Sequence, residues 1–144
     1  MKKLLPWALA LLCLGAHAAP PADTCLLTTA AIAMGTYLAG QATTLDASGS
    51  IVLDCNRKKA NVVITVGSGI SGNSNARAMG SGANRLGYQL YQDAARTVAW
   101  TTRNVITDRI AQRVDTYPVY ARIFANQDVT PGAYSDALTV TVLP

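Results

Sequence analysis

The run GAYSDALTVTVLP, residues 132–144, decides which fold we expect. Alternate positions share one face of an extended chain, and here they are Tyr134, Asp136, Leu138, Val140 and Val142. Threonines separate the last three, so the run has the period-two pattern of a strand with one face on an apolar core. No turn or partner strand follows it. We therefore expect one edge of this strand to be covered by an earlier segment or by another molecule.

The beginning of the chain has the layout of a secretory signal peptide. Lys2 and Lys3 give a charged start, residues 4–15 form a short apolar core, and residues 16–18 fit the small-x-small rule for cleavage. We predict cleavage between Ala18 and Ala19, so that residues 1–18 are a signal peptide and residues 19–144 form one exported domain.

Two other interpretations of this segment are less favoured. A transmembrane anchor needs about 18 to 20 apolar residues, and this run is shorter. A lipoprotein anchor on Cys13 is disfavoured because Leu12 stands where a small residue is expected. The mature chain is thus expected to contain no transmembrane segment.

Composition excludes several functions for the predicted mature domain. Removing residues 1–18 from 144 leaves 126 residues, with ten basic and eight acidic side chains. The charge is near +2 without a basic stripe, so we expect no nucleic-acid partner. The only histidine, His17, lies in the predicted signal peptide. A Ser-His-Asp or Cys-His mechanism and the usual zinc sites are then closed to the domain, and we expect neither an enzyme nor a bound metal or cofactor.

Two cysteines remain after cleavage, Cys25 and Cys55. In an oxidising compartment an even pair indicates a disulfide, and we predict that these two are joined. Two free thiols or half of a metal site are the alternatives, and the second lacks histidine partners.

Turn residues divide the remaining chain into short β-rich runs. The expected strands before the final run are residues 25–32, 50–55, 60–66, 86–91, 98–100, 105–110 and 117–124. Residues 67–84 are rich in Gly, Ser and Asn, and we expect them to form a long loop. Short strands at this spacing, without an apolar stripe of helical period, predict an all-β sandwich in one domain.

Eight stretches of the chain also resemble a known family. They are Cys25, GTY (35–37) with GSIVLDC (49–55), RAM (77–79) with LGYQLYQD (86–93), Trp100, VYARI (119–123) and PGAYSD (131–136). In this order, over the whole predicted mature chain, they resemble spore coat protein U (SCPU) domains. The L-x-Y-x-L-Y-x-D and P-G-x-Y-x-D stretches together are the most specific part.

This resemblance implies a subunit of an archaic chaperone–usher pilus. Such subunits have an immunoglobulin-like β-sandwich that lacks its last strand and is completed by a donor strand, first from a periplasmic chaperone and then from a neighbouring pilin subunit. An outer-membrane usher would be a third partner, and export would lead through the periplasm to the cell surface. Leu138, Val140 and Val142 would then line the donor-strand groove.

The segment ahead of Cys25 suggests a place in such a fibre. A donor strand needs on the order of ten residues that alternate apolar and polar. Residues 19–24 are few, do not alternate and include Pro20 and Pro21, which cannot donate ladder hydrogen bonds. We expect a subunit that accepts a strand but gives none, at the tip or end of a fibre, with a role in surface attachment and biofilm formation.

One other function remains open at this stage. The sandwich could be self-complete, with an internal segment such as residues 98–110 covering the open edge, and act as a secreted coat or binding module.

Overall fold

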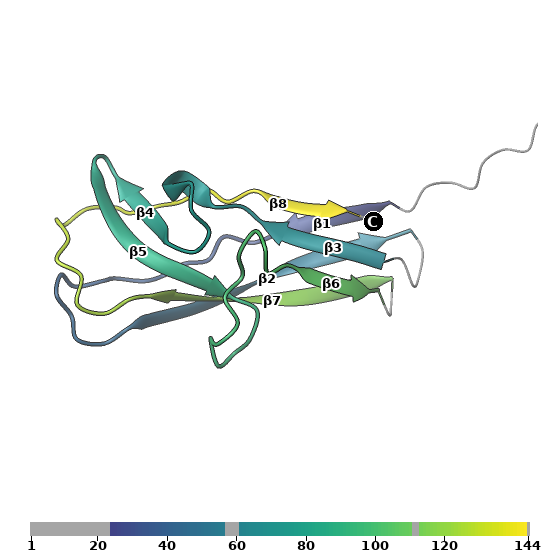
Figure 1. Cartoon of the computed structure of the whole chain (residues 1–144), viewed down its shortest axis with the longest axis horizontal. Helices are drawn as coiled ribbons and strands as arrows, with labels where there is room; N and C mark the ends of the chain where they lie inside the picture. The colour runs from purple at the N-terminus through teal and green to yellow at the C-terminus, as the bar shows by residue number, and fades with distance from the viewer. Residues whose placement is uncertain (1–23, 57–60, 111–112, 144) are drawn as a thin grey trace, which may run out of the picture.

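The computed structural model describes residues 24–56, 61–110 and 113–143, so the predicted signal peptide and its cleavage site at Ala18 and Ala19 lie outside it. The described residues form an all-β molecule with one short 3-10 turn (Figure 1). In chain order the elements are β1 (Cys25–Thr29), β2 (Leu45–Cys55), β3 (Asn61–Val66), η1 (Gly69–Ser71), β4 (Arg77–Ser81), β5 (Asn84–Tyr91), β6 (Ile106–Arg109), β7 (Val114–Ile123) and β8 (Val140–Leu143).

The strands form two antiparallel sheets packed as an elongated, curled sandwich (Figure 1). The larger sheet has the order β1-β2-β7-β5-β4, and the smaller one has the order β6-β3-β8. β1 is therefore an edge of the larger sheet, and β8 is an edge of the smaller one. This all-β architecture confirms the fold class expected from the sequence.

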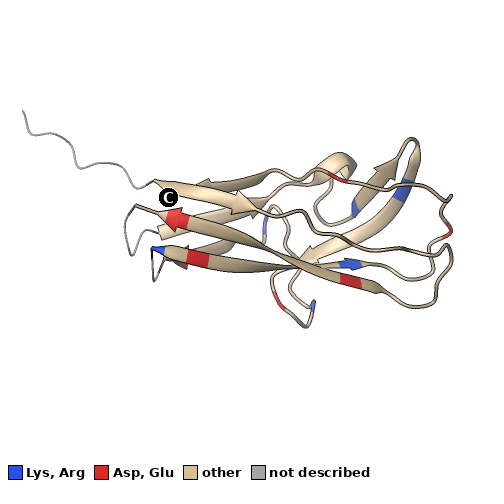
Figure 2. Cartoon of the chain, turned by 180° about the vertical axis from the view of Figure 1, so that it is seen from behind, with Lys and Arg blue, Asp and Glu red and all other residues tan. Residues whose placement is uncertain are grey.

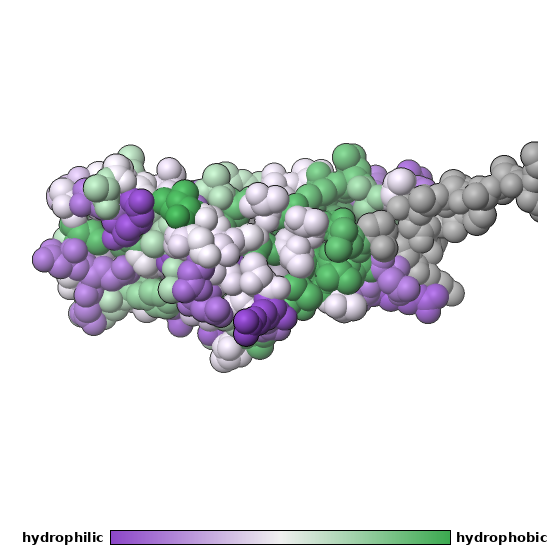
Figure 3. All heavy atoms as spheres, turned by 45° about the horizontal axis from the view of Figure 1, so that its top comes forward, coloured by the Kyte–Doolittle hydropathy of each residue, from purple (hydrophilic) through white to green (hydrophobic). Residues whose placement is uncertain are grey.

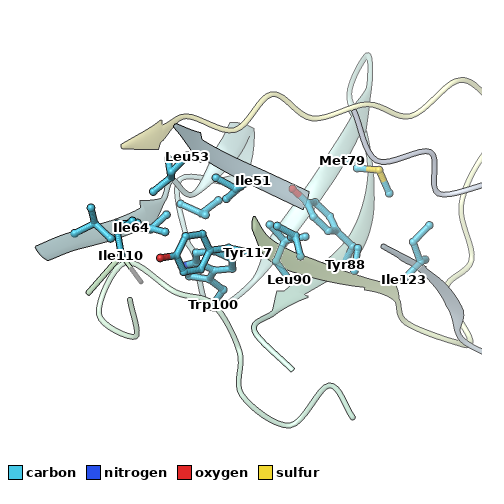
Figure 4. Close-up of a cluster of buried hydrophobic side chains, with 14 of the residues drawn as sticks. Ile51, Leu53, Ile64, Met79, Tyr88, Leu90, Trp100, Ile110, Tyr117 and Ile123 are labelled. Atoms are coloured by element: carbon cyan, nitrogen blue, oxygen red, sulfur yellow. The ribbon is translucent and has the colours of Figure 1, made fainter. Parts of the chain in front are cut away.

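Alternation along the strands builds the core between the sheets (Figure 4). Every second residue of the central strands is buried, as in Ile51, Leu53 and Cys55 of β2. β3, β5 and β7 contribute in the same way, and Trp100 is completely buried among them. Because burial follows the period of two, these runs could be recognised from the sequence.

Pro118 lies within β7 although proline has no N–H for a ladder. The Arg113 carbonyl accepts a hydrogen bond from the Cys55 N–H. Because hydrogen-bonded and non-hydrogen-bonded pairs alternate along an antiparallel ladder, the pair of Ser50 and Pro118 exchanges no hydrogen bonds. On the other side of β7, pairing with β5 begins only at Tyr120. The missing N–H therefore breaks no ladder bond.

The long loop predicted for residues 67–84 is wrong. That stretch contains η1 and the whole of β4, which forms a hairpin with β5 through Gly82 and Ala83. Gly82 has a φ of 58°, the left-handed conformation that such a turn requires. The Gly, Ser and Asn residues correctly predicted the turns of this stretch. Because these residues also flank β4 closely, the short strand was not recognised.

Several strands also differ from the prediction. β2 begins at Leu45 rather than at residue 50, and β7 begins at Val114 rather than at residue 117. The strand expected for residues 98–100 is only an isolated bridge at Ala99.

The first and last strands are shorter than predicted. β1 ends at Thr29 rather than at residue 32, and the final ladder begins only at Val140. Ahead of that ladder, Ser135 makes an isolated bridge to Gly80 of β4. The final run thus contacts both sheets.

The predicted disulfide is present between Cys25 and Cys55, which face each other across β1 and β2. It fastens an edge strand to its only ladder partner within the described chain.

Candidate functional site

A cavity of about 640 Å³ opens between the chain that follows β1 and the chain that leads into β8. Both sheets supply its floor, which consists of Ser50, Ile51, Val66, Met79, Tyr88, Leu90, Val119 and Ala121. Its two rims are residues 29–35 and residues 134–140. The floor is almost wholly apolar because all of these except Ser50 are inward positions of the strands.

A second cavity of about 500 Å³ continues the first. Met34, Gly35, Met79 and Tyr134 line both, so the two cavities are neighbours along one hollow. Residues 34–39 and 129–134 form the rims of the second cavity, with Leu86 and Ile123 beneath. We call the two cavities together the slot.

Beyond Thr29, the first rim is not hydrogen-bonded to any described strand. Residues 30–36 make no backbone hydrogen bond to any other described residue. Ile32 nevertheless holds this rim in place by packing over β2 at Gly49, where a β-carbon would lie 2.7 Å from Ile32 Cγ1. The rim therefore passes close to β2 only because residue 49 is glycine.

The second rim is paired on one side only. Gly67 donates its N–H to the Thr139 carbonyl at 2.8 Å, and Thr141 faces Thr65 in the same phase. Because the N–H and C=O of alternate residues point to opposite sides of a strand, those of Leu138, Val140 and Val142 point away from β3. Their side chains are half-buried and pack against the core.

β1 mirrors this arrangement at the other edge. Asn56 donates its N–H to the Thr24 carbonyl, so Leu26 and Thr28 direct their backbone groups toward β2. Those of Cys25 and Leu27 point outward, while their side chains are half-buried. Both sheet edges are continuous with the rims of the same hollow, which Thr29 of β1 and Val140 of β8 line, and an extended strand could pair with either edge.

Two of the three residues predicted to line the donor-strand groove line the slot, and the third lies next to it. Leu138 and Val140 line the slot, and Val142 packs against the core beyond its lining. These three residues could be predicted from the sequence because they alternate along one strand. The floor could not be predicted in this way, because Met79, Leu90 and Val119 come from three different strands.

One polar pair interrupts the apolar lining. The Tyr88 hydroxyl donates a hydrogen bond of 2.7 Å to Asp136 Oδ2, and the Ile70 N–H donates one of 2.9 Å to Oδ1. Tyr88 is 4% exposed, and burial together with the neighbouring carboxylate raises its pKa above the ordinary value. The hydroxyl therefore stays protonated and remains a donor to Asp136.

Arg77 lies deep in the molecule near this pair, and sequence analysis did not predict its burial. It is 1% exposed and donates to the backbone oxygens of Val66, Gly67, Ser74 and Trp100, and to Gln89 Oε1. Burial lowers its pKa, while the negative charge of Asp136 acts in the opposite direction. These bonds tie β3, β4 and β5 together beside the slot.

The described surface shows no concentration of charge. Figure 2 shows basic and acidic residues scattered singly over the strands and turns. Figure 3 shows apolar residues gathered over the part of the molecule where β1, β3 and β8 lie. In the described part of the chain, no three His, Cys, Asp or Glu side chains form a potential metal site. Among the same residues, no helix has the length and apolar character to span a membrane.

The internal segment suggested as a cover for the open edge lies elsewhere. Within residues 98–110, β6 pairs with β3 on the side opposite β8, and Ala99 bridges to Tyr91. That prediction is wrong, because the segment completes the far edge of the smaller sheet and leaves the slot open.

An all-β, immunoglobulin-like sandwich with a hollow between two sheet edges is the class of protein that these observations define. The family model for the Spore Coat Protein U domain matches residues 11–141, and the chain belongs to this family. The family predicted from the sequence is therefore confirmed. A search among curated proteins gave no match.

Solved structures include chains of similar fold. One is in the crystal structure of the CsuC–CsuE chaperone–tip adhesion subunit pre-assembly complex from archaic chaperone–usher Csu pili of Acinetobacter baumannii, with a TM-score of 0.62 and 20% identity. The similarity covers 83% of this chain but only 39% of the chain in that complex. A weaker match is the E. coli Hda pilus minor tip subunit HdaB, with a TM-score of 0.42 and 15% identity, covering 82% of this chain and 80% of that chain.

Proposed function

We propose that this chain is an exported structural subunit of a chaperone–usher pilus, and that the slot binds a donor strand. A periplasmic chaperone would supply the first strand, and a neighbouring pilin subunit would replace it after passage to the outer-membrane usher. The observation that carries the proposal is the slot itself, a largely apolar hollow whose two rims are continuous with the edge strands β1 and β8. β-augmentation fills such an edge with main-chain hydrogen bonds and alternate side chains.

Family and fold support the same function. SCPU membership extends over nearly all of the chain, and the similar chain of higher TM-score belongs to a complex of a chaperone with a pilus subunit. An open apolar hollow beside two free edges would also promote aggregation, which explains the need for a chaperone.

We further propose a tip or terminal position, with a role in surface attachment and biofilm formation. Pro20 and Pro21 in the segment ahead of β1 support it, because proline cannot donate ladder hydrogen bonds. To test this, the chaperone-bound chain is mixed with a peptide of its own residues 19–28 and with an N-terminal peptide from a sibling pilin. Capture of the sibling peptide alone is expected, and efficient capture of its own peptide would contradict the terminal position.

Donor-strand binding is tested by refolding the chain from denaturant with a synthetic peptide of alternating apolar and polar residues. Gel filtration and native mass spectrometry would then measure a one-to-one complex. Val140→Asp places a carboxylate on the slot lining and should abolish the complex, whereas Thr141→Asp, one residue further on the exposed face, should leave it unchanged. Equal binding by both variants, or a soluble monomer that refolds without peptide and ignores it, would refute the proposal and favour a self-complete domain.

A further inference from the structure

The slot contains one charged side chain. Among the described residues that line its two cavities, Asp136 alone carries a charge, and it occupies the inward phase shared by Leu138 and Val140. An apolar residue would be expected at such a position. The carboxylate is therefore the one charged point along a binding surface whose other described side chains are apolar or neutral.

The carboxylate is fixed in place and still able to accept a hydrogen bond. Among the described residues it accepts hydrogen bonds from the Tyr88 hydroxyl and the Ile70 N–H, one on each oxygen. Gly69 has a φ of 67°, and a β-carbon there would overlap the carboxylate, so glycine allows this close approach. An ionised carboxylate has about four acceptor positions, so about two remain for another donor.

The nearby charge favours a neutral donor. Arg77 is buried and forms no ion pair with a described carboxylate. Its positive charge is attracted by the negative charge of Asp136. A second cation in the slot would be repelled by Arg77 and would lose its hydration. A serine or threonine hydroxyl avoids both costs, and threonine also favours the extended conformation.

We propose that Asp136, held by Tyr88, sets the register of the donor strand by accepting a hydrogen bond from a serine or threonine hydroxyl at one inward position. This inference rests on the proposed function. Inward positions of a strand are about 7 Å apart, so a slip by two residues moves the hydroxyl onto an apolar part of the floor. A slip by one residue turns it out of the slot. Only one register satisfies the hydroxyl.

The test compares isosteric side chains at each inward position of a captured donor peptide. Starting from a peptide with valine at every inward position, each valine is replaced in turn by threonine, and binding to the unmodified chain is measured by competition. An unpaired hydroxyl in an apolar site should weaken binding by roughly tenfold or more. We expect that loss at all inward positions but one, where threonine binds at least as well as valine.

The double variant Tyr88→Phe/Asp136→Leu makes this charged point apolar, so valine should then be preferred at every position. Equal losses from threonine at all positions of the unmodified chain would overturn the register role while leaving strand binding intact. Failure to capture any peptide, the valine parent included, would overturn the proposed function and this inference together. If the double variant does not fold, the peptide series on the unmodified chain still tests whether Asp136 sets the register.

Discussion

Gly80 and Ser135 exchange two backbone hydrogen bonds, of 2.8 Å from the Gly80 N–H and 3.0 Å from the Ser135 N–H. Gly80 belongs to β4 of the larger sheet, and Ser135 precedes β8 of the smaller one. This bridge therefore joins the two sheets along the second rim of the slot. Asp136, the next residue, is held in the slot lining by the same connection.

Ser135→Pro removes one of these two donors and should weaken the rim. We expect the free energy of unfolding to fall by about 1 to 3 kcal/mol, because the Gly80 carbonyl loses its partner and proline restricts the backbone. Urea unfolding of the purified chain measures the change. Ser135→Ala keeps both backbone bonds and should be nearly neutral, since the Ser135 side chain is exposed. Equal effects would show that the bridge does not stabilise the rim.

The disulfide should stabilise the chain through the loop that it closes. Cys25 and Cys55 are 30 residues apart, and on the chain-entropy model a loop of this size is worth about 3 to 4 kcal/mol. We expect that loss in the double variant Cys25→Ala/Cys55→Ala by urea unfolding under oxidising conditions. Alanine avoids placing a hydroxyl at Cys55, which is completely buried. A reducing agent should weaken the unmodified chain and leave the variant unchanged, and a variant as stable as the oxidised chain would contradict the prediction.

Arg77→Lys should be strongly destabilising although it keeps the charge. Lysine cannot reproduce the fork that reaches four backbone carbonyls and Gln89, so buried acceptors and an ammonium lose partners. We expect a loss of about 3 kcal/mol or more in the free energy of unfolding. Arg85→Lys on the neighbouring strand is the matched control, because Arg85 is exposed and bonds only to nearby carbonyls. A change below about 0.5 kcal/mol in both variants would show that the Arg77 network is dispensable.

Asp46 should make a small part of the stability depend on pH. Arg122 donates hydrogen bonds of 2.7 and 2.9 Å to its carboxylate, which holds the pKa of Asp46 below its usual value, with a further contribution from Arg96. Since the folded pKa is depressed, this stabilisation is present above the unfolded pKa of about 3.9 and is lost as pH falls through the folded pKa. The pair is solvent-exposed, so we expect less than about 1 kcal/mol.

Unfolding measured from pH 6 down to pH 2 at low salt tests this expectation. Asp46→Asn should flatten the acid part of the curve, and Asp128→Asn, which removes an exposed carboxylate without an ion pair in the described structure, should not. Identical curves for the unmodified chain and Asp46→Asn would rule out the linkage.

Local patterns were enough to predict the all-β class, the core strands and the disulfide. β3, most of β7 and the second half of β2 bury every second residue, and β5 does so except that Gln89 is buried as well. The order of side chains in the sequence shows this period directly. Two cysteines in the predicted mature chain left one possible pairing, which is present. The phase of Leu138, Val140 and Val142 likewise placed them on the core side.

Only the tertiary structure decided what stands beside that last strand. Its free edge shares a slot with the chain after β1, about 100 residues earlier in the sequence, and the floor comes from five strands of both sheets. The tertiary structure alone also revealed the strand β4, the burial of Arg77 and the hydrogen bond between Tyr88 and Asp136. Periodicity reports which face of a strand is apolar, because that depends on neighbours in sequence. It does not report which strand lies alongside, because pairing between distant segments depends on the packing of the whole chain.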